Sequence, residues 1–530
     1  MFNSPVDSGI LNLPRDSINE ARYLGKSIAS AVHNKIKDLS TLSIERASLR
    51  MLGIRGANQE GTPWVNIFTE KCLSANLIQN GVLMILAQVC KHTSMNPQQA
   101  VEMVSENRIH LNDLIEVNGS KEIKKLCDEL ANKAYQNLSN KKKERLNFIN
   151  TLSSGTKPYL YVIVATGNIY EDVKQAKSAA LLGADIIAVI RTTAQSLLDY
   201  IPQGITTEGF GGTAATQENF AVMREALDEV SQKTGRYIRL VNYCSGLAMP
   251  EIATLGLIEG LDIMVNDAVY GILFRDINSL RTLTDQEFSR RILSFGDIII
   301  VTGEDNLIKT VDAKEMAHTV TASQIINYYL ALKSGLKPGL IGLGHAFEMD
   351  PSESDSFLHE LAQAWLVRDL FPQSPIKYMP PTRYMTGNIF RGMVLNAAFN
   401  LIGVLTNQEI LLLGMPTEAL HTPFIQDRFL SIENALYFKN AAGNLSNEFT
   451  LKESSLMRKR AIEVLNKAVN LLKVINQKGL FNALAEGTFA SIKRPENMGR
   501  GFAGVFVKGS SYYNPFLSLL PDNATDETEA

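Results

Sequence analysis

The chain has few of the residues that mark secreted, sulfur-ligated or membrane-spanning proteins. Only four cysteines occur among its 530 residues, and no two of them are spaced as in a CxxC motif. This argues against a disulfide framework, a zinc ribbon and a cysteine-held iron–sulfur cluster. No apolar run approaches the length of about 20 residues that a membrane-spanning helix needs. The first residues also lack the basic-then-apolar order of a signal peptide. We therefore expect a reduced, cytoplasmic protein with no membrane partner.

An excess of charge of one sign is also lacking. The 52 Lys and Arg residues nearly balance the 55 Asp and Glu residues, which leaves a net charge of −3. Proteins that bind nucleic acid usually carry a clear basic excess, so no nucleic-acid partner is expected. A hydrophobic content of 45% is ordinary for a globular protein. The length exceeds what one compact core usually holds, so we expect more than one structural unit.

Residues 1–154 predict a helical N-terminal accessory region. Apolar residues recur at helical spacing in DSINEARYLGKSIASAVHNKIKDL and again in KEIKKLCDELANKAYQNL. The basic run NKKKER at 140–145 predicts a solvated helix end, with a partner-docking patch as the alternative. Residues 431–530 predict a helical C-terminal extension whose acidic tail, DNATDETEA, is frayed.

Between these regions, residues 155–430 predict an α/β domain. Eight short β-rich runs alternate with helical ones: YLYVIVAT, ADIIAVIRTT, YIRLVNYCSG, LDIMVNDAVYG, DIIIVTGEDN, LIGLGHAFEM, IKYMPP and EILLLGM. Alternating strands and helices build parallel sheets, and eight such units are the number in a closed (β/α)8 TIM barrel. An open doubly wound sheet is the alternative, but its GxGxxG fingerprint after the first strand is absent.

Polar residues gather where each predicted strand ends. In TIM barrels these ends form the active site. The residues are Asn168, Tyr170, Arg191, Thr192, Thr193, Asn242, Tyr243, Ser245, Asn266, Asp267, Tyr270, Arg275, Glu304, Asp305, Asn306, His345, Glu348, Lys377, Tyr378, Glu418 and His421. Packing alone does not require such a density of polar groups, so we expect a site for a polar, multiply charged ligand.

The glycine-rich stretch TTEGFGGTAATQENF, residues 206–220, lies between the second and third predicted strands. Glycines can turn backbone N–H groups toward an anion, but they also serve in purely structural lids, so both interpretations stay open. A phosphate site is favoured by Arg191 at the end of the second strand, whose guanidinium can bind phosphate oxygens in a bidentate manner. The hydroxyls of Ser196 and Ser245 would lie near it.

Four carboxylates at strand ends raise the possibility of a magnesium site. They are Asp267, Glu304, Asp305 and Glu348. Three carboxylates can hold Mg²⁺ in a barrel. The alternative, which we favour, pairs them with Arg275, Lys377 and a cationic substrate, and leaves no metal site.

The strand-end motifs together resemble one family. YVIVATGNIYEDV, VIRTTAQSLLDY, TTEGFGGTAATQENF, NYCSGLAMPE, NDAVYGILFRDIN, TGEDN, GLGHAFEMDP, KYMPPTRYMTGNIF and TEALHTPF are similar to the large (alpha) subunit of lysine 5,6-aminomutases. The resemblance runs through nearly the whole chain. It implies an isomerase of lysine degradation that moves the terminal amino group of D-lysine or L-β-lysine from C6 to C5 by a radical 1,2-shift.

The resemblance also implies two cofactors and a set of site residues. Adenosylcobalamin would supply the radical, and pyridoxal 5′-phosphate (PLP) would carry the migrating nitrogen over the barrel mouth. The phosphate would be held by Arg191, Ser196, Ser245 and Arg275. Tyr270 would pack against the pyridine ring and act in catalysis. Asp305, Asn306 and Lys377 would bind the amino-acid end of the substrate.

Two elements of the family's chemistry are absent from this chain. No lysine follows the first predicted strand, where PLP-binding racemase barrels carry theirs, and no DxHxxG motif for the cobalamin tail occurs. In the family both belong to a small beta subunit. The resemblance therefore implies an assembly of two large and two small subunits in which this chain is inactive alone.

Three alternatives remain. The nearest is a D-ornithine 4,5-aminomutase type of subunit, whose substrate is one methylene shorter. The second, from another class, is a magnesium-dependent barrel lyase. The third is a non-catalytic barrel that binds a partner, which the crowded polar mouth disfavours.

Overall fold

Eight parallel strands close into a barrel. The computed structural model describes residues 9–115, 121–190, 195–209, 211–302, 312–345, 349–380 and 382–522. The barrel strands are β2 (Tyr159–Ile163), β3 (Ile186–Ile190), β4 (Arg239–Tyr243), β5 (Ile263–Val265), β6 (Ile299–Thr302), β7 (Ile341–His345), β8 (Ile376–Tyr378) and β9 (Ile410–Leu412). Each strand pairs with the next, and β9 returns to β2 with Ile410 opposite Tyr159. The predicted TIM barrel is confirmed.

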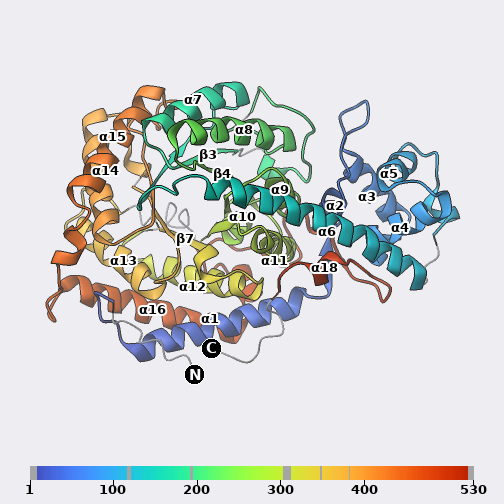
Figure 1. Cartoon of the computed structure of the whole chain (residues 1–530). Coiled ribbons are helices and arrows are strands. Elements are labelled where there is room, and N and C mark those ends of the chain that lie inside the picture. Colours follow the sequence, from blue (N-terminus) through green and yellow to red (C-terminus); the bar gives the residue numbers. More distant parts are fainter. Residues whose placement is uncertain are drawn as a thin grey trace.

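A ring of helices covers the outside of the barrel (Figure 1). They are α7 (Ile169–Leu182), α8 (Gln217–Thr234), α9 (Met249–Ile258), α11 (Ser279–Phe295), α12 (Ala317–Lys333), α13 (Ser356–Leu370), α14 (Ile389–Leu405) and α15 (Ile425–Ala441), while the short α10 (Ala268–Arg275) lies at the end of β5, before α11. The strands are therefore buried on both faces, which explains why they read as continuous apolar runs.

Alternate residues of each strand face two different apolar layers. In β3, Ile186 and Ala188 belong to the cluster inside the barrel, whereas Ile187 and Val189 face the helices, and all four are fully buried. The period of two of a β-strand produces this division. It leaves only the strand ends available for polar chemistry.

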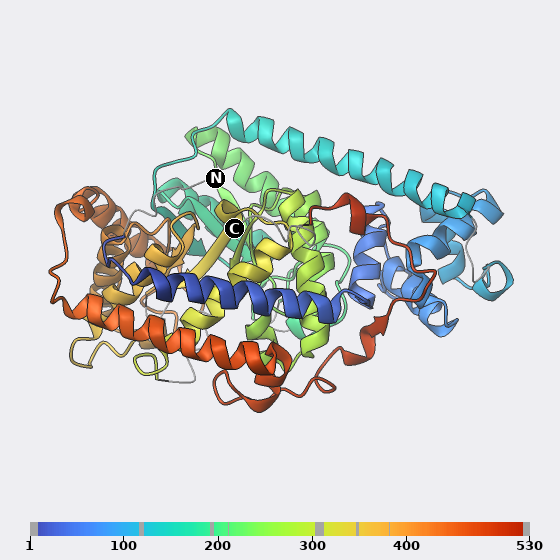
Figure 2. The same cartoon turned by 90° about the horizontal axis from the view of Figure 1, so that it is seen from below.

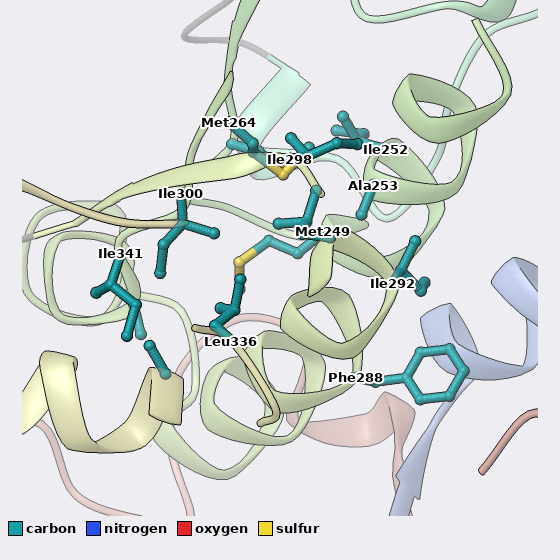
Figure 3. Packing of buried hydrophobic residues seen from close by; sticks show 14 of the residues in the cluster. Met249, Ile252, Ala253, Met264, Phe288, Ile292, Ile298, Ile300, Leu336 and Ile341 are labelled. Carbon is teal, nitrogen blue, oxygen red and sulfur yellow. The ribbon is translucent and has the colours of Figure 1, made fainter. Parts of the chain in front are cut away.

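The outer layer packs the apolar faces of the helices onto the strands. Figure 3 shows Met249, Ile252 and Ala253 of α9 in one apolar layer with Ile292 of α11 and Met264 of β5. These side chains are at most 4% exposed. This packing holds α9 and α11 in place against the barrel, and both helices carry residues that bear on the site described below.

Two long helices from opposite ends of the chain lie side by side along the barrel flank (Figure 2). They are α1 (Arg15–Ile36) and α16 (Leu456–Lys478), and both pack on α12. Gly25 of α1 permits this approach, because a Cβ there would lie 2.6 Å from the Tyr329 ring of α12. The accessory helices are thus integrated with the barrel wall.

The remaining N-terminal helices form a lobe beside the barrel (Figure 1). They are α2 (Leu42–Met51), α3 (Trp64–Ser74), α4 (Val82–Thr93), α5 (Pro97–Ser105) and α6 (Lys121–Asn150). A short antiparallel ladder joins β1 (Leu39–Thr41) to β10 (Val505–Val507), near the other end of the chain. The C-terminal helices α17 (Leu480–Glu486) and α18 (Phe516–Leu519) complete the structure.

The basic run at 140–145 lies within α6. The sequence had predicted a helix end at this place, and that prediction is wrong. Its Arg145 Nη1 donates to Asp228 at 2.6 Å, and its Lys142 Nζ lies 2.6 Å from Asp297. Lys141 Nζ also donates to the carbonyl oxygen of Ile258 at 3.4 Å, so three basic side chains of the run attach α6 to the barrel, while Lys143 faces solvent. Within the described ranges, no helix has both the length and the apolar character needed to cross a membrane.

Candidate active site

The predicted cofactor-binding residues come from three neighbouring strand ends. Ser196 lies in a short 3-10 turn (Gln195–Leu197) after β3, Ser245 follows β4, and Tyr270 and Arg275 belong to α10 after β5. Arg191 lies outside the described residues, as do Asp305 and Asn306 of the predicted substrate set and Glu304, Glu348 and Phe210. The contacts of those six stay predictions.

The two serine segments are in direct contact. The backbone N–H of Leu247 donates to the carbonyl oxygen of Ser196 at 3.0 Å. Between Ser245 and Leu247 stands Gly246, where an added Cβ would lie 2.5 Å from the Cα of Ser196. Real atoms do not approach so closely, so the contact requires glycine. The structure thereby brings the loops after β3 and β4 together, as the predicted site requires.

The third segment, α10, packs against the second in the same way. A Cβ on Gly271 would lie 2.2 Å from the carbonyl oxygen of Ser245. The helix begins at Asp267, whose Oδ1 accepts from the backbone N–H of Tyr270 at 3.3 Å and thereby caps the helix. Close packing and the cap together place Tyr270 at the start of α10, beside the serine loops.

Arg275 of α10 has hydrogen-bonding capacity to spare. Its Nη2 donates to the Tyr270 hydroxyl at 3.3 Å, and its Cζ lies 5.4 Å from the centre of the tyrosine ring. Its Nε is shielded from solvent and has no hydrogen-bond partner among the described residues. A buried donor without a partner is costly, and an anion bound beside it would remove that cost. Together with two hydroxyl-bearing loops, this donor set fits a phosphate group.

Lys377 lies on the opposite side of the barrel mouth from the serine loops. It is 1% exposed, and its Nζ lies 6.0 Å from the centre of the Tyr161 ring. It lines a cavity of about 460 Å³ among the ends of β2, β4, β8 and β9. The other polar or aromatic lining residues are Tyr243, Thr382, Glu418, His421, Thr422 and Arg428. A cavity of this size accommodates a small amino acid.

Two tyrosines connect the cavity with the serine loops. The Tyr161 hydroxyl lies 2.9 Å from that of Tyr243, which stands two residues before Ser245. Tyr161 was not predicted to be a site residue, because its alternation in β2 looks like that of any core aromatic. The pair places two hydroxyl groups inside the barrel, next to the cavity that Tyr243 and Lys377 line.

Arg428 of α15 was also missed by sequence reasoning. Its Nε donates to the carbonyl of Ile163 at 3.2 Å and its Nη1 to the carbonyl of Pro423 at 2.8 Å. Burial lowers the pKa of this guanidinium to about 10, against the raising effect of Asp172. Its partners show that it holds the loop after β9 against β2, and no motif in the sequence signals such a role.

The glycine-rich stretch forms a wall against the turn after β2. A Cβ on Gly209 would lie 1.9 Å from the carbonyl oxygen of Gly212 and 2.9 Å from the Cα of Gly167. Thr213 accepts from the N–H of Gly167 at 3.1 Å and donates to the carboxylate of Asp172. In the described part of residues 206–220, the glycines therefore permit close packing of one backbone segment on another. This agrees with a structural role for the stretch, one of the two interpretations that the sequence had left open.

Two polar residues at strand ends cap helices. Asn168 accepts from the N–H of Tyr170 at 3.0 Å at the start of α7, as Asp267 does for α10. Asp267 is 4% exposed. Of the four carboxylates that had suggested a magnesium site, Asp267 is the only one that the structure describes. The helix cap already occupies one of its oxygens.

The fold and the site together define a class of protein. A parallel eight-stranded barrel whose carboxyl end carries an arginine with a buried Nε, two serine loops in contact and a cavity beside a buried lysine is typical of a barrel enzyme for small charged molecules. Residues 11–519 match the family described as the D-lysine 5,6-aminomutase TIM-barrel domain of the alpha subunit. The chain belongs to this family of aminomutase alpha subunits, which are isomerases.

Individual relatives support the same assignment. The chain is 51% identical to the lysine 5,6-aminomutase alpha subunit of Acetoanaerobium sticklandii, over 96% of this chain and 98% of that one. It is 48% identical to the subunit of the same name from Fusobacterium nucleatum, over 97% and 99%.

The alternative based on ornithine is more distant. The D-ornithine 4,5-aminomutase subunit beta of A. sticklandii is 28% identical, over 68% of this chain and 50% of that one. Lysine 5,6-aminomutases are therefore the much closer group.

Proposed function

We propose that this chain is the large subunit of an enzyme that moves the terminal amino group of D-lysine or L-β-lysine from C6 to C5. The observation that carries the proposal is the meeting of the Ser196 and Ser245 loops with α10, where Arg275 Nε is buried without a partner among the described residues. A phosphate-bearing cofactor would supply the acceptor that no described residue supplies to this donor. The high identity to two lysine 5,6-aminomutase alpha subunits supports the choice of reaction.

PLP and adenosylcobalamin are the proposed cofactors. When bound, adenosylcobalamin supplies the initiating radical and PLP carries the nitrogen that migrates. The residues of this chain bind and orient: Ser196, Ser245, Arg275 and, by resemblance, Arg191 hold the phosphate. The ring of Tyr270, over which the Arg275 guanidinium lies, offers an aromatic surface to the pyridine. The barrel wall encloses the mouth and keeps water from reactive species.

The substrate is proposed to enter the cavity beside Lys377. An α-amino acid carries a carboxylate, and a buried ammonium is a suitable partner for it. Lys377 is on the inner side of β8 and lines that cavity. By resemblance, Asp305 and Asn306 bind the amino-acid end as well. A substrate held between Lys377 and the phosphate side of the mouth spans the barrel opening.

A small beta subunit is the proposed partner, in an assembly of two large and two small subunits. The relatives are named alpha subunits, which implies a second kind of chain in those enzymes. The sequence of this chain has no DxHxxG motif for the cobalamin tail. The partner would supply that motif and the lysine that binds the PLP aldehyde.

The test reconstitutes the pair under anaerobic conditions with adenosylcobalamin and PLP. D-lysine, L-β-lysine and D-ornithine are offered separately, and the products are identified by NMR. We expect a 2,5- or 3,5-diaminohexanoate that forms only when both chains are present. A metal chelator should not reduce the rate at which it forms. The absence of turnover with all three substrates, together with no change in PLP absorbance, would refute the proposal. Loss of activity with chelator alone would favour the magnesium-dependent lyase instead.

A further inference from the structure

The loop that carries Ser196 is anchored three residues later by an ionic contact between the half-buried Asp199 and two buried arginines. The carboxylate of Asp199 accepts from Nη1 and Nη2 of Arg281 at 3.0 and 2.8 Å, and it also pairs with Nη2 of Arg46. The side chains of Arg281 and Arg46 are 0% and 3% exposed. Burial alone would raise the pKa of Asp199, but the two guanidiniums outweigh it and hold the pKa well below its usual range. The carboxylate therefore stays ionised and paired.

Arg46 contacts a second carboxylate with a different nitrogen. Its Nε donates to Oε1 of Glu251 at 2.7 Å, and the other oxygen of Glu251 accepts from Nε of Arg50 at 2.8 Å. Glu251 is fully buried in the first turn of α9, the helix that directly follows the Ser245 loop. One guanidinium from α2 thus joins the segment after Ser196 to the segment after Ser245.

The two segments meet again nearer the site. The Leu247 N–H donates to the Ser196 carbonyl oxygen at 3.0 Å, and Gly246 packs on Ser196 so closely that no side chain fits. The two loops are therefore joined twice, through their direct contact and through the bridge that Arg46 makes between Asp199 and Glu251. The planar, forked guanidinium of arginine can serve two carboxylates at fixed geometry, which a lysine ammonium cannot do in the same way.

We infer that Arg46 is a positioning residue for the phosphate side of the site, because it sets the relative placement of the Ser196 and Ser245 loops through Asp199 and Glu251. The helical lobe before the barrel is then part of the machinery that orders the site. This inference rests on the proposed function for its ligand, but the contacts that carry it do not depend on any ligand.

The test compares three variants of the full-length chain. Arg46→Lys keeps the charge but cannot bridge both carboxylates. Asp199→Asn leaves the Arg46–Glu251 pair intact and weakens the contact between Arg46 and residue 199. The matched control is Arg224→Lys. Arg224 is similarly buried, at 7% side-chain exposure, and pairs with Asp228 and Asp262, each at 2.9 Å, where α8 meets the opposite end of the barrel.

Two readouts separate positioning from general stability. The first is hydrogen exchange measured by mass spectrometry in peptides covering 195–203 and 243–250. The second is the ratio of the dissociation constants for pyridoxal and PLP, which differ only in the phosphate. We expect Arg46→Lys and Asp199→Asn to speed exchange in both peptides and to lower the preference for PLP by about tenfold. Arg224→Lys should lower the melting temperature without either effect.

Each outcome has a definite meaning. If the Arg46 and Asp199 variants match the control, with wild-type exchange and wild-type ligand preference, the inference is wrong. If Arg46→Lys does not fold, Asp199→Asn decides alone by the same two readouts. If the wild-type chain does not prefer PLP to pyridoxal, the proposed phosphate site fails, while the exchange data still judge the positioning role.

Discussion

The guanidinium of Arg275 lies over the ring of Tyr270, with its Cζ 5.4 Å from the ring centre and its Nη2 3.3 Å from the hydroxyl oxygen. The two side chains are on the same short helix, which the Asp267 cap and the close approach of Gly271 fix against the Ser245 loop. An arginine held in this way has little freedom to lose when it binds an anion. This preorganisation favours both a high affinity for the anion and a defined position of the bound anion.

The first prediction follows from this pair. Replacing Arg275 with Met removes charge-assisted hydrogen bonds, each of which contributes about 1.5–3 kcal/mol. PLP affinity should therefore fall on the order of 10- to 100-fold, whereas pyridoxal affinity changes little. Tyr270→Phe, which keeps the ring and loses one hydrogen bond, should have a much smaller effect. Equilibrium dialysis with both ligands measures these changes, and equal losses for PLP and pyridoxal would contradict a phosphate role for Arg275.

The second prediction concerns the glycine between the serine loops. A Cβ at Gly246 would lie 2.3 Å from the Ser196 carbonyl oxygen, so Gly246→Ala must push the loops apart. We expect a loss of about 1–3 kcal/mol in stability, as for other overpacked sites, and weaker PLP binding. Gly339→Ala is the matched control, because a Cβ there meets nothing within 4 Å. Thermal unfolding and PLP titration of both variants test this, and equal behaviour would mean that the contact is dispensable.

The third prediction concerns the lysine cavity. Lys377→Met should raise KM for the amino-acid substrate on the order of tenfold or more, because the carboxylate loses its buried cation. PLP affinity should change little, since the phosphate residues lie at other strand ends. Lys439→Met is a suitable control, because this lysine has a 13% exposed side chain and lies near Asp185, at the opposite end of the barrel. Steady-state kinetics of the reconstituted pair give both constants, and an unchanged KM would remove Lys377 from the substrate site.

The fourth prediction is a dependence of stability on pH. Burial raises the pKa of Asp369 from 3.8 to about 6, although its Oδ2 accepts from the Leu11 N–H at 2.9 Å. Because the folded-state pKa is higher than the unfolded one, the native state binds more protons between these values. The contribution of Asp369 to the free energy of unfolding, at most about 3 kcal/mol, is then complete below about pH 4 and is lost as the pH rises through 6.

Asp369→Asn tests this dependence, because it keeps the acceptor oxygen for Leu11 and removes the titration. The melting temperature of the variant should change less between pH 4 and pH 6 than that of the parent chain, and at pH 7 the variant should be at least as stable. Asp113→Asn, on the exposed surface, is the control. Parallel pH profiles for Asp369→Asn and the parent chain would show that Asp369 does not titrate in this range.

Much of the architecture could be predicted because it depends on local patterns. The eight apolar runs are parallel strands, since only strands covered on both faces alternate in this way with amphipathic helices. The order of strand and helix also located the candidate site at the carboxyl ends of the strands. For that reason Ser245, Tyr270 and Arg275 could be placed at this end of the barrel before their contacts were known. Their grouping with Ser196 into one cofactor site was implied by the family resemblance, and the structure brings the segments together.

Other features could not be predicted because they depend on which distant residues become neighbours. Asn168 and Asp267 looked like ligands but cap helices, and the basic run at 140–145 attaches α6 to the barrel through Lys142 and Arg145. The roles of Tyr161 and Arg428 at the mouth arise from partners on other elements.

The sequence by itself determined the barrel, its order of elements and the residue types at its mouth, because periodicity and propensity act over a few residues. Only the tertiary structure decided how the mouth is held. The contact of Arg46 with Asp199 joins positions 153 residues apart, and the close approach of Gly246 to Ser196 depends on backbone geometry that no residue type encodes alone. A buried charge needs a partner that compensates for its lost hydration, and only the folded chain determines which residue that partner is.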